Sequence, residues 1–255
     1  MSKDKIHQEN LAENYKHALL NNDFSEALRM LRAGAQIDIH SFCEEHIWSE
    51  SQRLSLSAFQ FLTDHGLDLN KQLVKSGESW ARLLLGLKLS RKYRDYEVSV
   101  FKELIDQDKI NLKQFDKYGD TFLMALVRIA PNVELIDFFI SECKGIKETI
   151  NIVSPINGHN ALSIAFTTTR YEILKVLQNN GAVLENVDGL ILLKLLSRTH
   201  DLGYLDIINY HVDKGLRFKL SEKTCNQGKL TEEARRFISK IFSDNLSIWD
   251  EPLQQ

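Results

Sequence analysis

Apolar residues recur along the chain with the spacing of helices. In the segment EILKVL, the apolar residues at 173, 174, 176 and 177 line one side of a helix, whereas a strand would present them on both faces. The segment ALSIAF at 161–166 forms a wider apolar face, and its two small alanines would let a second helix approach closely. Because neither helix could bury such a face alone, the pattern predicts helix pairs that stack on neighbouring pairs.

A longer sequence motif repeats along the chain. It is a helical stretch with an apolar pair, a short polar break, a glycine and an alternating tail, as in EALRMLRAGAQIDI, SAFQFLTDHGLDLN, EILKVLQNNGAVLE and DIINYHVDKGLRFK. The glycines of these four copies are Gly34, Gly66, Gly181 and Gly215. The first two are 32 residues apart and the last two are 34 apart, and the 115 residues between leave room for two more units. The chain is therefore predicted to hold about six units, each with a glycine in the left-handed conformation that often ends a helix.

These units resemble the ankyrin repeat, in which a finger loop ending in Gly-x-Thr-Pro-Leu-His is followed by two antiparallel helices and Gly-Ala. The fourth unit, DKYGDTFLMAL, keeps the glycine, threonine and leucine of this pattern at Gly119, Thr121 and Leu123. The fifth, PINGHNALSIAF, keeps Gly158 but has Asn160 and Ser163 in place of threonine and histidine. The first unit keeps the helix residues and the Gly-Ala that follow. The resemblance covers roughly residues 8–220.

Units two, three and six depart from the ankyrin pattern. Unit two lacks the Thr-Pro-Leu-His segment, unit three carries the charged insertion KLSRKYRDYE, and unit six has an insertion around Thr199 to Tyr204. A different α-solenoid fold is therefore also consistent with the sequence. In the family the threonine and histidine help to hold the finger loop by hydrogen bonds. Because these units do not keep the full Thr-Pro-Leu-His segment, we expect them to depend more on apolar packing. We also expect irregular loops and lower stability than in a consensus array.

The predicted fold class is all-α, an ankyrin-like helical repeat solenoid of about six helix pairs with a C-terminal capping helix. We expect two parts, a repeat array at 8–220 and a C-terminal loop and capping helix at 221–255. In the second part, Thr231 suits the start of a helix with Glu232 and Glu233 in its first turn. The apolar stripe that follows would close the last repeat, and a helix that binds a partner or a membrane surface is the alternative.

Composition narrows the possible functions. With 32 basic and 35 acidic side chains, the chain has no basic excess of the kind that binds phosphate backbones, so nucleic acid is not an expected partner. The three cysteines lack metal or disulfide spacing, which favours a reducing compartment. The charged first residues do not resemble a secretory signal, and no apolar run has membrane-spanning length. We therefore expect a cytoplasmic protein.

Catalytic motifs are weak in this sequence. Cys43 and His46 form a close Cys–His pair at helical spacing, but local spacing supplies neither the further ligands of a metal site nor the orienting group of a hydrolase. Glycine-rich phosphate loops are absent, and the GESW segment at Gly77 lacks the second glycine of a serine nucleophile motif. We expect no enzyme activity, no catalytic residue, no cofactor and no metal ion.

The expected function is a protein–protein interaction module that binds a partner on its concave face and finger tips. The ankyrin resemblance places the variable, partner-binding positions at Lys75, Ser76, Glu78, Lys117, Tyr118, Asp120, Arg128, Ile156, Asn157, His159, Thr167, Val187, Asp188 and Arg198. Tyr118 and Ile156 are the first to test, because they are bulky groups where a fold alone would leave polar ones. Packing against the neighbouring finger is the alternative for both.

Two other functions remain open from the residues. One is an enzyme with a cryptic site on the atypical repeats, and the other is a membrane-associated adaptor that uses the C-terminal helix and the basic segment Lys88 to Glu97. The irregular repeats in a Lys-, Asn- and Ile-rich chain also resemble ankyrin proteins that intracellular bacteria deliver into host cells. That resemblance implies an effector that reaches a eukaryotic host protein without a Sec signal. We expect no membrane contact and a monomer outside the complex.

Overall fold

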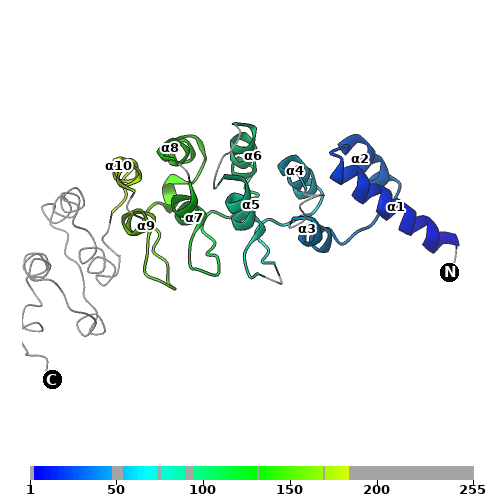
Figure 1. The fold of residues 1–255 in the computed structure, drawn as a ribbon, viewed down its shortest axis with the longest axis horizontal. Helices are drawn as coiled ribbons and strands as arrows, with labels where there is room; N and C mark the ends of the chain where they lie inside the picture. The colour runs from blue at the N-terminus through cyan, green and yellow to red at the C-terminus, as the bar shows by residue number, and fades with distance from the viewer. Residues whose placement is uncertain are drawn as a thin grey trace, which may run out of the picture. The chain divides into compact units, whose positions relative to one another are not determined.

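The computed structural model describes residues 3–47, 54–73, 76–89, 95–130, 132–168 and 170–183 (Figure 1). The chain divides into two compact units, residues 1–111 and 112–255. Within the described ranges there are ten α-helices and one short 3-10 helix, and the only extended pairing is an isolated bridge between Gln72 and Ser79. The prediction of an all-helical fold is confirmed for the residues that the structure describes.

The first unit contains three successive helix pairs. They are α1 (Lys3–Leu20) with α2 (Phe24–Arg32), α3 (Ile39–Ile47) with α4 (Leu56–Asp64), and α5 (Trp80–Leu89) with α6 (Asp95–Asp106). Helix α1 packs on α2, and α6 packs on both α4 and α5. Large side chains fill the space between them, and Tyr15, Phe59, Trp80 and Phe101 are fully buried. The predicted stacking of apolar faces is thus the organising contact of this unit.

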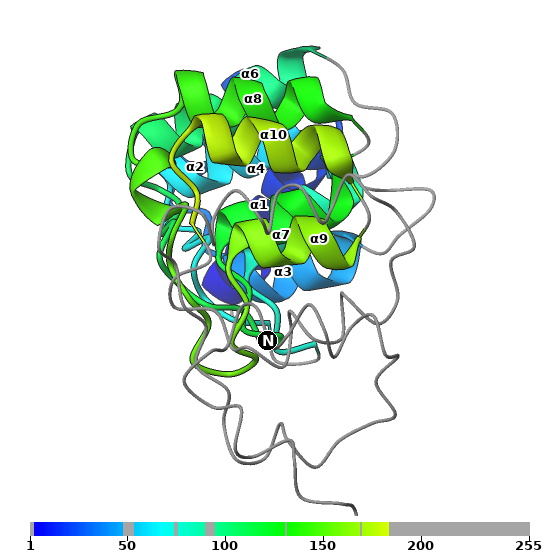
Figure 2. The same cartoon turned by 90° about the vertical axis from the view of Figure 1, so that its left-hand side faces the viewer.

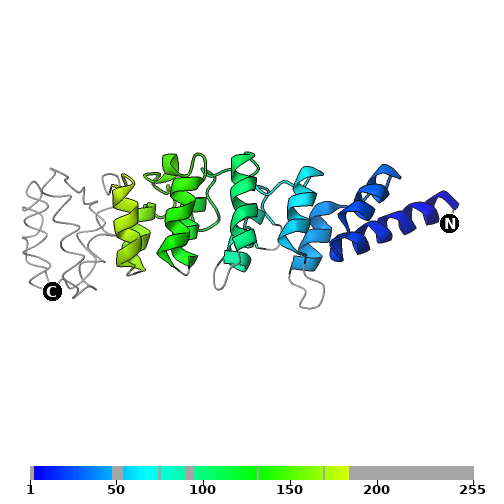
Figure 3. The same cartoon turned by 90° about the horizontal axis from the view of Figure 1, so that it is seen from above.

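The second unit contains α7 (Phe122–Ile129), α8 (Val133–Glu142), the 3-10 helix η1 (Lys147–Thr149), α9 (Ala161–Thr167) and α10 (Tyr171–Asn179). Helices α7 and α9 form one layer and α8 and α10 form a second layer (Figures 1 and 2). Figure 3 shows α8 and α10 side by side. The loops that precede α7 and α9 extend away from the α8 and α10 layer, so both are placed at one edge of the unit.

A residue in the left-handed conformation follows the second helix of a repeat unit. Gly34, Gly66 and Gly181 have positive φ angles of 93°, 110° and 88°, as their positions after a helix predicted. Asp108 takes the same left-handed conformation after α6, with a φ of 58°. Its amide donates to Ile105 and the next amide donates to Leu104, as the amides of Gly181 and Ala182 donate to Gln178 and Leu177 after α10. Because aspartate tolerates this conformation better than most residues, the third unit ends its helix without a glycine.

Side chains at the starts of seven of the described helices satisfy backbone amides that have no partner inside the helix. The capping residues are Asp23, Asp38, Ser55, Ser79, Thr121, Asn132 and Asn160. At the other end of α7, the guanidinium of Arg170 donates to the carbonyl oxygens of Val127 and Ala130. A cation at a helix C-terminus also complements the helix dipole. The sixth predicted pair, Gly215 and the predicted C-terminal helix at 221–255 lie outside the described residues.

Tyr15 supplies a test of the core in the first unit. Its side chain is fully buried, and its hydroxyl has no hydrogen-bond partner among the described residues. Burial, with a smaller contribution from Cys43, raises the pKa of Tyr15 to about 12. The native state therefore holds this proton more tightly than the unfolded chain, whose tyrosines titrate near 10. The stability that depends on neutral Tyr15 is complete below pH 10 and is lost as pH rises from 10 towards 12.

Tyr15→Phe should therefore remove part of the alkaline loss of stability. We expect the wild type to lose roughly 2–3 kcal/mol more than the variant across this interval, as measured by urea unfolding at a series of pH values. At neutral pH the variant should be as stable as the wild type or more stable, because an unpaired buried hydroxyl has been removed. Parallel pH profiles for the two proteins would contradict this account.

Candidate functional site

The finger loop 116–120 is organised by one carboxylate. Asp116 Oδ1 accepts hydrogen bonds from the amides of Tyr118 and Asp120, at 2.8 and 2.9 Å. The Asp116 amide donates to the Asp120 carbonyl, and the Gly119 amide donates back to Asp116. Gly119 has a φ of 82°, which a side chain would disfavour. Asp116 is buried, so this polar network holds the tip of the loop in one shape.

The finger loop 154–159 is organised in the same way by a serine. Ser154 Oγ accepts from the amides of Ile156 and Asn157, each at 3.2 Å. The Ser154 amide donates to the His159 carbonyl at 2.8 Å, and the Gly158 amide donates to Ser154. Gly158 has a φ of 70°. This loop is one residue longer than finger loop 116–120 between the residues that close it, and both present their central residues outward.

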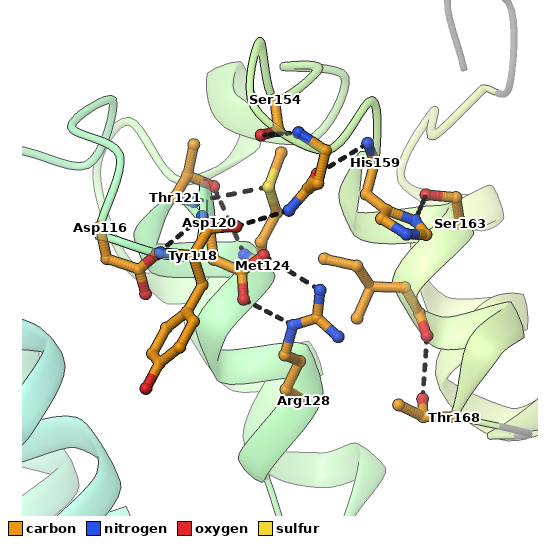
Figure 4. A network of polar contacts seen from close by, with 12 residues as sticks. Asp116, Tyr118, Asp120, Thr121, Met124, Arg128, Ser154, His159, Ser163 and Thr168 are labelled. Carbon is orange, nitrogen blue, oxygen red and sulfur yellow. Dashed lines mark hydrogen bonds and ion pairs between the residues drawn. The ribbon is translucent and has the colours of Figure 1, made fainter. Parts of the chain in front are cut away.

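The two finger loops of this unit contact each other directly (Figure 4). Asn157 Nδ2 donates to the Tyr118 carbonyl at 2.7 Å. A Cβ atom placed on Gly119 would lie 2.9 Å from the Ile156 Cβ and would also collide with Ser154 Oγ. The loops are thus packed at van der Waals distance, and Gly119 is required by both its conformation and its neighbours.

The helices that follow the fingers keep their capping hydrogen bonds despite the degraded Thr-Pro-Leu-His box. Before α9, Asn160 Oδ1 accepts from the Ser163 amide and Ser163 Oγ accepts from the Asn160 amide, both at 2.9 Å. Before α7, Thr121 Oγ1 accepts from the Met124 amide, and Met124 Sδ accepts from the Thr121 amide, both at 3.4 Å. The expectation of units held mainly by apolar packing needs correction here, because different side chains make equivalent reciprocal bonds.

The capping pair before α9 gives a further prediction. Asn160→Ala should lower the free energy of unfolding by about 1–2 kcal/mol, because the Ser163 amide loses its acceptor in a buried setting. Asn160→Thr restores the family's usual residue and should recover most of the loss. Chemical denaturation of both variants measures the difference. Equal stability of Asn160→Ala and wild type would show that this cap is not needed.

Tyr118 and Ile156 occupy the tips of the two finger loops. Their side chains are 51% and 64% exposed, so the alternative of packing within the fold accounts for less than half of either surface. Lys117 Nζ lies 4.9 Å from the centre of the Tyr118 ring, a cation–π distance. His159 lies behind the tip, with Nδ1 3.0 Å from Ser163 Oγ. Tyr118 and Ile156 are the exposed large hydrophobic residues of the described second unit.

Asp120 and Arg128 form an ion pair beside these tips. Arg128 Nε lies 2.5 Å from Asp120 Oδ2, and Arg128 Nη2 lies 3.2 Å from Oδ1. The Asp120 side chain is completely buried, whereas that of Arg128 is 33% exposed. Asp120 therefore differs from the expectation of a contact residue: its carboxylate lies beneath Arg128, where a partner cannot reach it. It orients Arg128, which does reach solvent.

The remaining predicted contact residues lie elsewhere or outside the described ranges. Ser76 and Glu78 belong to a similar loop in the first unit, where the Leu73 amide donates to the Glu78 carbonyl and Gly77 has a φ of 68°. Thr167 ends α9, and its side chain is not described. The positions outside the described residues are Lys75, Val187, Asp188 and Arg198.

Sequence reasoning did not identify the residues that shape the finger loops. Asp116 and Ser154 set the shapes of the two loops and were not among the predicted contact residues, whereas Asn157, which was among them, also joins the loops through its side-chain amide. A polar residue with a small side chain three or four positions before a glycine was the available signal, since aspartate and serine often bond to amides two residues later. Their importance follows from the loop geometry.

Cys43 and His46, the residues considered for catalysis or metal binding, lie in environments that do not suit these roles. Cys43 is fully buried on α3, and this burial, with a smaller contribution from Asp38, raises the pKa of its thiol. His46 packs edge-on against Phe42. In the described ranges, nowhere do three His, Cys, Asp or Glu side chains gather so as to hold a metal ion. A buried, protonated thiol is a poor nucleophile.

The basic segment Lys88 to Glu97 is described only at its ends. Lys88 belongs to the last turn of α5, whereas Tyr96 and Glu97 belong to α6. Tyr96 is 42% exposed and Glu97 is buried. None of the helices in the described ranges combines the length and apolarity that crossing a lipid bilayer requires.

Comparison with known proteins places the fold. No family model matches the chain, and no curated protein matches its sequence. Among solved structures, the chain is similar to the ankyrin repeat domain of Bcl-3, described as a unique member of the IkappaB protein family. The TM-score is 0.53 at 16% sequence identity, over 80% of this chain and 89% of that chain. The chain therefore has the ankyrin-repeat fold, as the repeat pattern predicted, in a strongly diverged form.

Stacked repeats of this kind form extended surfaces along the array. In the second unit, the exposed residues Tyr118 and Ile156 lie on loops at one edge of the described helices.

Proposed function

We propose that this chain binds a partner protein through finger loops 116–120 and 154–159, with Tyr118 and Ile156 as apolar anchors. The observation that carries the proposal is their exposure on two adjacent loops that are joined by a hydrogen bond and braced by buried polar side chains. Rigid loops lose little conformational entropy on binding, and exposed aromatic anchors often dominate interface energies. Lys117, Asn157, His159 and Arg128 surround the anchors and would form the polar rim.

The role is binding rather than catalysis in this proposal. Support comes from Cys43, whose thiol is buried. Ser76 and Glu78 of the first unit and Thr167 of the second stay predicted contact residues.

Affinity capture with the full chain as bait tests the proposal. The wild type is compared with Tyr118→Ala/Ile156→Ala, and we expect the double variant to lose the specific partner, with at least a tenfold weaker Kd, roughly the effect of removing two anchors. The matched control is Ile6→Ala/Tyr96→Ala, which removes the same residue types from positions exposed to 43% and 42% on α1 and α6. Equal recovery of the partner by both double variants would reject the finger surface.

The origin of the partner is a finer proposal. The irregular repeats in a Lys-, Asn- and Ile-rich sequence support a bacterial effector that acts on a eukaryotic host protein in the cytoplasm. We also propose that the chain is a monomer before it binds. The same capture is therefore made from eukaryotic and bacterial lysates, and light scattering of the free chain measures its mass. A specific partner found only in bacterial lysate, or a stable dimer of the free chain, would contradict the corresponding part.

A further inference from the structure

The electrostatic character of the finger surface is set by which charges are buried. Two carboxylates lie close to the finger tips, those of Asp116 and Asp120, and both residues are buried, at 7% and 2% exposure. Asp116 is occupied by two backbone amides of its own loop, and Asp120 by the guanidinium of Arg128. Neither carboxylate is offered to a ligand.

The cations of the same surface are more accessible. Lys117 is exposed and lies over the Tyr118 ring, and a third of the Arg128 side chain reaches solvent. Asp120 uses the Nε and Nη2 atoms of Arg128, and no described residue accepts a hydrogen bond from Nη1. A guanidinium carries five N–H donors in a fixed plane, so fixing one edge orients the remaining donors. Arg128 is thus held by the buried carboxylate of Asp120 (Figure 4), while a third of its side chain reaches solvent.

We propose that the surface formed by the two finger loops and Arg128 recognises an acidic segment of a partner protein. A carboxylate of that segment pairs with the outer donors of Arg128, and a nearby apolar side chain rests on Tyr118 and Ile156. This inference rests on the proposed function and names the chemistry of the partner. Among the described finger residues, a basic segment would meet the cations of Lys117 and Arg128 while the carboxylates of Asp116 and Asp120 are buried, and bringing like charges together costs free energy.

The arrangement favours a carboxylate over a neutral hydrogen-bond acceptor. Charge-assisted hydrogen bonds to arginine are about twice as strong as neutral ones, and a forked geometry adds directional selectivity. Because Arg128 is already oriented by Asp120, binding does not have to restrict its side chain. Lys117, three residues before the buried Asp120 and adjacent to an anchor, adds a second positive charge at the tip.

A random dodecapeptide library displayed on phage provides the probe. It is selected on the full wild-type chain and counter-selected on Tyr118→Ala/Ile156→Ala, so that only peptides that depend on the finger anchors remain. We expect these peptides to be enriched in aspartate or glutamate within a few residues of an aliphatic or aromatic residue. Replacing those acids by asparagine or glutamine in the synthetic peptide should weaken binding about tenfold or more.

Variants of Asp120 and Arg128 then test whether Arg128 recognises the acidic residue of the peptide. Arg128→Ala alone would leave a buried charge, so the test uses Asp120→Asn/Arg128→Gln, in which an amide pair replaces the ion pair. This variant should bind the acidic peptide and its amide version with equal affinity, whereas Arg128→Lys should show an intermediate preference because it keeps the charge without the fork. Thermal unfolding of each variant shows that it is folded.

The outcomes separate this inference from the proposed function. Finger-dependent peptides that lack acidic enrichment, or an unchanged acid preference in Asp120→Asn/Arg128→Gln, would overturn the acidic segment and leave the finger surface intact. A library that yields no finger-dependent peptide also overturns it, while the capture experiment decides the surface independently.

Discussion

Arg128→Ala should lower the free energy of unfolding by about 3 kcal/mol, roughly the cost of leaving a buried charge without its partner. The Asp120 side chain is completely buried, and both of its oxygens are paired with Arg128, at 2.5 and 3.2 Å. In this variant the Asp120 carboxylate is shielded from water by its burial and has also lost the positive charge of Arg128. Urea unfolding at neutral pH measures the effect.

The matched variants show which partner causes the loss. Asp120→Asn/Arg128→Gln should lie within about 1 kcal/mol of wild type, because no charge is buried and a neutral hydrogen bond can form. Asp120→Asn alone should fall between the two, since Arg128 is partly exposed and water can solvate it. If Arg128→Ala costs less than the neutral double variant, the pair is not the source of stability and the orienting role of Asp120 is wrong.

Gly119→Ala should be the most damaging of the glycine substitutions in the second unit, with a loss of about 2–4 kcal/mol. Two effects add at this position. The φ of 82° is unfavourable for any residue with a Cβ, and the added methyl would meet Ser154 Oγ and the Ile156 Cβ in the neighbouring finger loop. Neither neighbour can retreat easily, because Ser154 holds its own loop through two amides.

Gly181→Ala separates these two effects. Gly181 has a comparable φ of 88°, and a Cβ there would have nothing within 4 Å. It should therefore show the conformational cost alone, about 1–2 kcal/mol. Thermal or chemical denaturation of both variants gives the comparison, and a binding assay shows whether Gly119→Ala also displaces the finger tips. Equal losses at the two positions would mean that the close packing of the fingers contributes nothing.

The repeat could be predicted because its signals are local. Helical spacing of apolar residues and a glycine after each second helix depend on a few neighbouring residues, and Gly34, Gly66 and Gly181 adopt the expected left-handed conformation. The third unit was harder to place because Asp108 fills the role of the glycine. Aspartate occurs in many other settings, so its conformation cannot be assigned from its identity.

The candidate site was predicted in part. The ankyrin resemblance pointed to Tyr118 and Ile156, and the structure shows both exposed, although their contact with a partner is still a prediction. The same resemblance placed Asp120 among the contact residues, and the structure buries it beneath Arg128. Both residues are polar and lie eight positions apart, and sequence spacing does not show which one covers the other.

The sequence alone determined that this chain is a stack of helix pairs with loops of the ankyrin type, because periodicity and helix-ending residues act within each repeat. Tertiary structure decided the rest. The bond from Asn157 to the Tyr118 carbonyl links fingers 39 residues apart, and the burial of Asp120 depends on how Arg128 folds back over it. These are contacts between loops and helices whose relative positions follow from packing, so the direction of a charge and the exposure of an anchor became visible only in the folded chain.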